Sequence, residues 1–207
     1  MATVTSLPRP LPSVFDPALP PPLRRDSLLS ALPPVLRDRL AQGRTESRPR
    51  FAEDGFDGMA ERWSPPAGVT PAEAALAQRA HDELCASVLA PVDGDHLLAR
   101  ILSLLSHFPA KGLSPEVERL VALDWAEDLG EYPAWTVDAA ARLWRRSRKW
   151  RPSIAEMRAL CEELCAPERA LAARLRALPA AGRDERDGAA PAGGVRAPGA
   201  GTLRRMG

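Results

Sequence analysis

The sequence contains no asparagine and only two lysines and two isoleucines, although 28 of its 207 residues are Lys or Arg. Almost all of the positive charge is therefore arginine, a bias that indicates a GC-rich coding sequence rather than selection for arginine chemistry. The formal net charge is only +1, so the whole-chain charge says little about partners. A single arginine is weak evidence of function, and only a local cluster carries weight.

Cysteine is also scarce. Cys85, Cys161 and Cys165 are an odd and small number, which is typical of reduced thiols rather than of a disulfide framework. No run of about 18 consecutive apolar residues occurs, so the sequence predicts no membrane span. The proline-rich N-terminus lacks the uninterrupted apolar segment of a signal peptide. We therefore expect a cytoplasmic protein with no membrane partner.

Motifs for enzymatic chemistry are missing as well. There is no Walker A loop and no glycine-rich turn between a strand and a helix, and the three histidines lie in no catalytic register. His81/Cys85 and Cys161/Cys165 have i, i+4 spacing, from which two facing helices could build a zinc site. Buried cysteines in apolar helices explain both pairs better. We expect no enzyme, no metal and no cofactor.

Helix signals are concentrated in the middle of the chain. Thr70 and Ser153 each begin a capping box, in which a Ser or Thr is followed three residues later by Glu. Apolar residues recur at helical spacing after both, and no alternating apolar and polar pattern of useful length occurs. The predicted fold is all-α, a small helical bundle over residues 70–178.

Outside this bundle the composition predicts little fixed structure. Seven prolines among the first 22 residues predict a disordered segment over 1–26, and the leucines that follow favour a short helix over 27–43. The segment 44–69 lacks periodicity and predicts a linker, whose isolated aromatic residues are candidate docking points. Residues 179–207 are rich in Ala, Gly, Pro and Arg, and their few large apolar side chains predict a disordered tail.

A basic cluster over residues 142–151 stands out, because it holds six positive charges in ten residues directly after an acidic helix expected to begin near Ser114. At about 100° per residue, four of these charges fall on one arc of the expected helix, opposite its apolar face. They are Arg142, Arg145, Arg146 and Lys149, here named the basic stripe. Trp135 projects toward the same arc and could stack on a nucleic-acid base.

The basic stripe should strain its own helix. Arg142/Arg146 and Arg145/Lys149 are like-charge i, i+4 pairs, each of which destabilises an isolated helix by about 0.2 to 0.5 kcal/mol. A polyanion or an acidic partner would relieve that strain. Two alternatives stay open: the stripe is an ordinary solvated face, or it pairs with the preceding acidic helix.

The block over residues 123–164 ends on WRPSIAEMRALC, in which Ser153 begins a helix after Pro152. This ending resembles the W-P-P-S-x-x-E-F-x-x-L-C ending of the lambda-type replication protein P family, and the spacing before it is similar to the phage helicase loader and inhibitor family. Arg151 departs from the pattern, because a second proline is expected there. The matching residues are Trp125, Leu129, Tyr132, Val137, Ala140, Trp150, Pro152, Ser153, Glu156, Leu160 and Cys161.

This resemblance implies a non-enzymatic, phage-type DNA-replication adaptor that loads or restrains a replicative helicase. The helicase is then the expected protein partner, with single-stranded or duplex DNA as a further candidate. The alternative is a DNA-binding regulator or packaging adaptor that uses the basic helix directly. On either hypothesis the predicted binding residues are Trp135 and the basic stripe.

Overall fold

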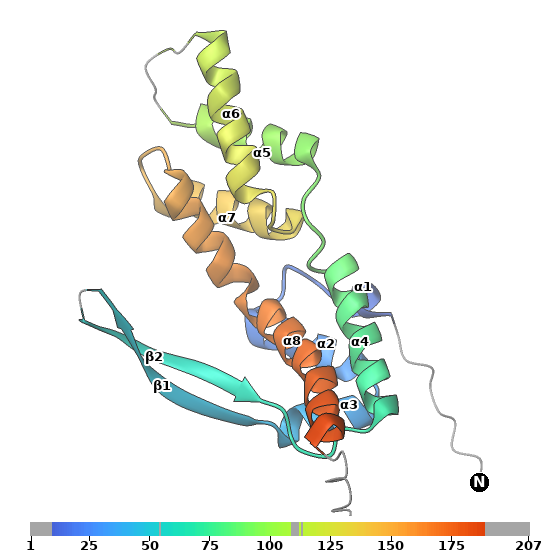
Figure 1. Cartoon of the computed structure of the whole chain (residues 1–207). Coiled ribbons are helices and arrows are strands. Elements are labelled where there is room, and N and C mark those ends of the chain that lie inside the picture. Colours follow the sequence, from blue (N-terminus) through green and yellow to red (C-terminus); the bar gives the residue numbers. More distant parts are fainter. Residues whose placement is uncertain (1–9, 54, 109–111, 113, 189–207) are drawn as a thin grey trace, which may run out of the picture.

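The computed structural model describes residues 10–53, 55–108, 112 and 114–188, which form a mostly helical, elongated molecule with a small two-stranded antiparallel sheet (Figure 1). The helices are α1 (Leu11–Val14), α2 (Pro21–Ala31), α3 (Pro34–Gln42), α4 (Pro71–Ala86), α5 (Gly94–Ser106), α6 (Pro115–Leu129), α7 (Ala134–Ser147) and α8 (Ile154–Gly188). The strands are β1 (Arg44–Ala52) and β2 (Gly55–Ser64). Of the helices described, none has the length and apolar character needed to cross a bilayer.

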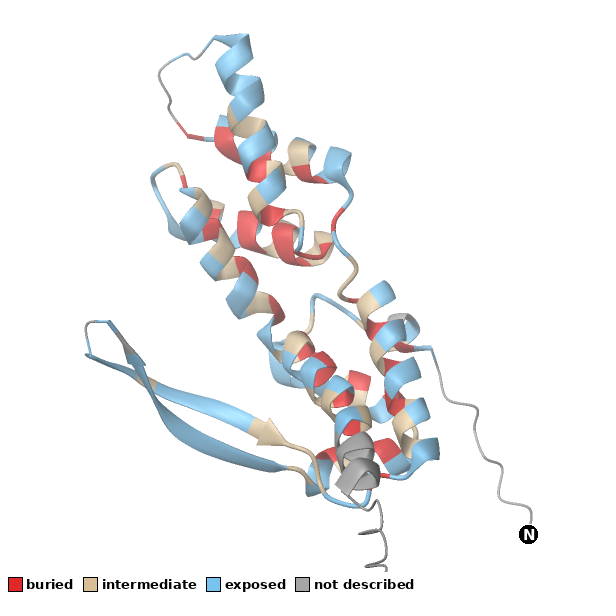
Figure 2. Ribbon diagram, in the orientation of Figure 1, coloured by how far each residue is buried: buried red, intermediate tan, exposed pale blue. Residues whose placement is uncertain are grey.

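Two hydrophobic cores lie along α8, and Figure 2 shows their buried residues as two groups. The first half of α8 packs with α5, α6 and α7 through Met157, Cys161 and Cys165, and we call this the α5–α7 core. The second half packs with α1 to α4 through Leu171 and Leu175, and we call this the α1–α4 core. A single long helix therefore carries both halves of the molecule.

The capping box predicted at Thr70 is present and fixes the start of α4. The Thr70 hydroxyl accepts a hydrogen bond from the Glu73 N–H at 3.3 Å, and the Glu73 carboxylate accepts one from the Thr70 N–H at 2.8 Å. Arg39 of α3 lies 2.9 Å from the same carboxylate. The Arg39 guanidinium and the Thr70 N–H together lower the pKa of Glu73 to about 2. This one side chain thus caps α4 and ties it to α3.

The all-α prediction is wrong at residues 44–64, which form a β-hairpin inside the predicted linker. β1 and β2 pair antiparallel, with Arg44 opposite Ser64 and Phe51 opposite Phe56. An alternating pattern is produced when one face of a sheet is buried and the other is solvated. Nearly all described side chains of this hairpin are exposed instead, so no alternation marks it in the sequence.

The structure also differs from the prediction of disorder over 1–26 and of one short helix over 27–43. α1 and α2 lie wholly or partly inside the first range, and α2 and α3 replace the single helix. Prolines occupy the first turns of α2 and α3, where a missing N–H breaks no helical hydrogen bond. Residues 1–9 lie outside the described part of the chain.

The bundle predicted over 70–178 is therefore too short at both ends. The α1–α4 core contains Leu28 and Leu36, both fully buried, so α2 and α3 belong to the folded unit. At the other end α8 passes Pro179 and continues to Gly188. The tail was predicted over 179–207, so the prediction is wrong at 179–188, which are helical, and the rest of it, 189–207, lies outside the described residues.

Ser153 begins α8 with the second predicted capping box. Its hydroxyl accepts a hydrogen bond from the Glu156 N–H at 3.2 Å, and the Glu156 carboxylate accepts one from the Ser153 N–H at 2.9 Å. Ser153→Ala should lower the free energy of unfolding by about 0.5 to 2 kcal/mol, because the first turn loses an acceptor. Urea denaturation measures this change. Ser103→Ala, at an exposed position inside α5, is the matched control and should cause no loss; an equal loss in both variants would contradict the capping role.

Candidate partner-binding site

The basic stripe is positioned by the packing of α7 on the α5–α7 core. Val137, Ala140 and Trp144 are buried at helical spacing on one side of α7, so the residues between them face away from the core. α7 packs against α5 and α8. Because these two helices hold α7, the orientation of its outer face is set by the core.

The predicted stripe is correct for Arg142, Arg145 and Arg146, which lie on α7, and wrong for Lys149, because α7 ends at Ser147 and Arg148 has extended backbone angles. Arg142, Arg146 and Lys149 are exposed and Arg145 is half-buried. No ion pair or side-chain hydrogen bond joins any of the four to another residue in the described part of the chain. Their charges are thus balanced only by solvent and by any bound partner.

The acidic helix before the stripe does not supply the missing counter-charges. Carboxylates at and just after the C-terminal end of α6 face α8 instead, where Arg158 lies 2.7 Å from Glu131 and 3.8 Å from Asp128. Arg169 of α8 lies 3.4 Å from Glu131. The ion pairs seen at this end of α6 therefore join it to α8, and none in the described residues joins it to the stripe.

Trp135 does not fit the predicted role in base stacking. Its Nε1 donates to the Val88 carbonyl at 2.8 Å, and its ring centroid lies 5.2 Å from that of Phe15 and 4.9 Å from the Arg24 guanidinium carbon. These contacts come from segments far away in the sequence, so the spacing within α7 gives no sign of them. Trp135 joins α7 to the N-terminal segment and is not free to stack on a base.

Asp138 lies on the same arc of α7 and closes the stripe on its N-terminal side. The Arg100 guanidinium lies 2.5 Å from the Asp138 carboxylate, and the His96 ring nitrogen lies 3.1 Å from it. Both partners come from α5. This acidic side chain is therefore neutralised by α5 and does not pair with the neighbouring arginines of α7.

Trp150 is the aromatic residue that sequence reasoning missed. It follows α7 directly after Lys149, and 55 % of its surface is exposed. The Arg148 guanidinium carbon lies 5.8 Å from its ring centroid and 5.5 Å from that of Trp144. Trp150 lies beyond Ser147, where α7 ends, so helical periodicity within α7 gives no signal for its exposure.

Most residues behind the family resemblance serve the core or its caps. Seven of the eleven are buried: Trp125, Leu129, Tyr132, Val137, Ala140, Pro152 and Cys161. Leu160 is half-buried, and Ser153 and Glu156 form the capping box. Within this set of described residues, Trp150 alone is exposed and outside the capping box, although its side chain adds to the Ser153 hydrogen bonds that lower the pKa of Glu156. The resemblance therefore rests mainly on packing, with Trp150 as its one surface feature.

The cysteine and histidine pairs do not come together. Cys161 and Cys165 lie in the α5–α7 core, while Cys85 packs on the α1–α4 core, 3.5 Å from a ring nitrogen of His81. Burial raises the pKa of Cys161 to about 12 and that of Cys165 to about 11, so both are thiols at neutral pH. Over the described ranges, no group of three or more His, Cys, Asp or Glu side chains could hold a metal ion.

Comparison with known proteins gives no independent guide to this site. No family model, curated protein or solved structure matches the chain. The site is therefore interpreted from its chemistry, which among the described residues is three unpaired arginines on α7, an unpaired lysine just after the helix and an exposed indole next to that lysine.

Proposed function

We propose that this chain is a non-enzymatic adaptor of the phage DNA-replication type, which loads or restrains a replicative helicase through the basic stripe. The observation that carries the proposal is the absence of any counter-charge to the stripe among the described residues. An acidic surface on the helicase would supply it, and such charge complementarity mainly speeds association and selects the partner. The helicase itself is inferred from the family resemblance.

Exposed apolar side chains favour a protein partner over DNA as the main ligand. The half of the molecule that carries the stripe exposes Val117, Leu120 and Leu123 of α6, at 42 %, 60 % and 50 % of their surface. Exposed apolar patches rimmed by polar residues are typical of protein interfaces.

Direct DNA binding is the second candidate, and Trp150 is the observation that favours it. Cations that follow the backbone and an exposed aromatic ring that stacks on a base are the two parts of a single-strand site. On this alternative the chain is a DNA-binding regulator or packaging adaptor.

The quadruple variant R142Q/R145Q/R146Q/K149Q tests both functions. Glutamine has nearly the same helix propensity, and the change removes the like-charge pair Arg142/Arg146 within α7, so the fold should stay intact or become slightly more stable. Binding to a purified replicative helicase should weaken, chiefly through slower association, in surface plasmon resonance. The control R44Q/R62Q/R79Q/R176Q removes four exposed arginines outside the α5–α7 half and should leave binding unchanged.

A single-stranded oligonucleotide separates the two candidates. If the stripe contacts DNA, the slope of log affinity against log salt should flatten by about 3 in the quadruple variant, given about 0.7 to 0.9 per neutralised phosphate. If the stripe contacts the helicase, the wild type already binds DNA weakly, and the quadruple variant loses only its binding to the helicase. If the quadruple variant behaves like the wild type in both assays, both functions are contradicted and the basic stripe is an ordinary solvated face.

A further inference from the structure

The β1–β2 hairpin, here named the arm, projects from the body beside α8 (Figure 1). Its base is fixed, because the Trp63 ring lies directly over Gly43 and occupies the space that a Cβ would need there. Arg174 of α8 lies 5.9 Å from the same ring. Beyond this base nearly all described side chains are exposed. A lone two-stranded hairpin is at best marginally stable in water, so the arm needs a further contact to hold its shape.

The tip of the arm is apolar and acidic together. Phe51 and Phe56 pair edge to face with ring centroids 6.0 Å apart, and 70 % and 64 % of their surfaces are exposed. In sequence the segment 49–59 contains three carboxylates and one arginine. Arg50 lies 2.6 Å from Asp57, so Glu53 is the carboxylate that carries no ion pair among the described residues of the tip. A tip with this chemistry fits an apolar cavity with a basic rim.

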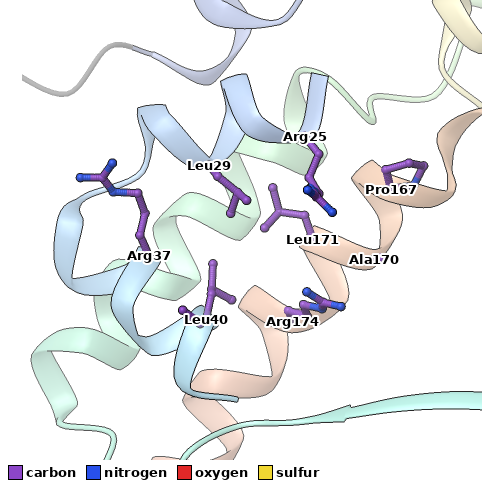
Figure 3. Close-up of a pocket in the computed structure, with 9 residues that line it drawn as sticks. Arg25, Leu29, Arg37, Leu40, Pro167, Ala170, Leu171 and Arg174 are labelled. Carbon is purple, nitrogen blue, oxygen red and sulfur yellow. The ribbon is translucent and has the colours of Figure 1, made fainter. Parts of the chain in front are cut away.

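Such a cavity lies between α2, α3 and α8, with a volume of about 500 Å³ (Figure 3). Figure 3 shows leucine side chains turned toward it, with Arg25 and Arg174 beside them and Arg37 extending outward from its edge. The leucines are Leu29, Leu40 and Leu171, and the arginines are Arg25, Arg37 and Arg174. Within the described residues Arg37 has no ion pair and Arg25 contacts only Asp26, at 3.1 Å. The cavity thus offers free positive charge around an apolar floor.

We propose that the arm tip of one copy of this chain docks into this cavity of a second copy, reciprocally, to form a two-fold dimer. The arm cannot fill its own cavity. Arg174 lines both the cavity and the groove under the arm base, whereas the nine residues of β1 carry the tip about 30 Å away from that base.

A two-fold arrangement satisfies both surfaces at once. When two arms lie antiparallel, each tip arrives at the base of the other arm, and the cavity lies beside that base. The interface is then isologous and closed, so it makes a dimer and not a filament. The exposed strand edges of the two arms also come side by side and can pair. Phe51 and Phe56 would cover the leucines, and Glu53 would face the arginine rim.

The positive charge around the cavity favours the arm tip over the other candidate occupants. The segment 189–207 has three arginines and no carboxylate, so the arginine rim would repel it. Nucleic acid would suit the rim but not the leucine floor or the acidic tip. A small amphipathic anion is a competing occupant, and it would bind the cavity of a monomer.

The oligomeric state of the full chain tests the proposal. Sedimentation equilibrium of the wild type should give a dimer of the 22.4 kDa chain. Phe51→Ser with Phe56→Ser should raise the dissociation constant about tenfold or more, because it removes the aromatic anchors. Glu53→Arg and Arg37→Glu should each weaken the dimer, and together they should restore it, since the charges are exchanged across the interface. Circular dichroism confirms that each variant is folded.

Three results would overturn the proposal. The first is a wild type that stays monomeric throughout the concentration range. The second is a dimer that tolerates both the tip and the rim variants. The third is a Glu53→Arg/Arg37→Glu double variant that dimerises no better than the single variants, which would show that the tip does not dock at the cavity rim. If a fatty-acid probe binds a monomeric wild type and Arg37→Glu abolishes that binding, the cavity is a small-ligand site instead. None of these results depends on the helicase proposal.

Discussion

Arg24→Met should lower the free energy of unfolding by about 3 to 5 kcal/mol, because it leaves a buried carboxylate without its counter-charge. The Arg24 Nε lies 2.8 Å from Glu168, and the two side chains are 4 % and 0 % exposed. A charge in such surroundings is stabilised only by its partner and by hydrogen bonds. Removing the guanidinium removes most of that stabilisation at once.

The pair lies where the two cores meet along α8. Pro167 has no N–H, so the helical hydrogen bond to the carbonyl of residue 163 is missing. The Arg24 guanidinium donates a hydrogen bond to the next carbonyl of α8, that of Leu164, at 2.7 Å. It also donates to the Leu19 carbonyl at 3.2 Å. Arg24 therefore attaches α2 to α8 beside an interruption in the helix, and its loss should loosen the N-terminal helices first.

Two further variants make the test specific to the buried pair. Arg25→Met changes the neighbouring exposed arginine, which contacts only Asp26 among the described residues, and should alter stability by less than about 0.5 kcal/mol. The double variant R24M/E168L removes both charges and should be more stable than R24M alone, because no uncompensated charge remains. Urea denaturation measures all three; equal midpoints for R24M and R25M would show that the pair contributes nothing.

The sequence predicts the parts of this fold that depend on local signals. The capping boxes at Thr70 and Ser153 predict the starts of α4 and α8, because a cap involves residues three positions apart. The arm and the Arg24–Glu168 pair depend on contacts over long separations. Arg24 is one of the many arginines of the chain and lies in a proline-rich segment, and nothing nearby in the sequence indicates a buried partner at 168.

The same distinction holds for the candidate site. The orientation of Arg142, Arg145 and Arg146 follows from helical periodicity and from the buried face of α7, so it could be predicted, whereas Lys149 lies beyond the end of the helix. Trp135 occupies the same arc but is held by Val88 and Phe15, which no local pattern brings near. The exposure of Trp150 depends on where α7 ends and how the chain turns into α8, and helix boundaries are the least predictable feature of a sequence.

Trp144→Ala should also lower the free energy of unfolding by about 3 to 5 kcal/mol, the usual range for removing a buried aromatic side chain. Trp144 is 3 % exposed in the α5–α7 core. Its Nε1 donates to the Trp150 carbonyl at 2.9 Å, so it also holds the turn between α7 and α8. The variant should therefore lose both core packing and the fixed position of Trp150, as measured by urea denaturation and near-ultraviolet circular dichroism.

Trp144→Phe and Trp150→Ala separate these two contributions. Phenylalanine keeps much of the apolar contact but cannot donate to the Trp150 carbonyl, so W144F should cost about 1 to 3 kcal/mol through the unsatisfied acceptor and the smaller ring. W150A removes an exposed side chain while the carbonyl remains, and should change stability by less than about 0.5 kcal/mol. If W150A instead destabilised the protein as much as W144A, Trp150 would be a packing residue, and the exposed indole would be lost as evidence for a binding surface.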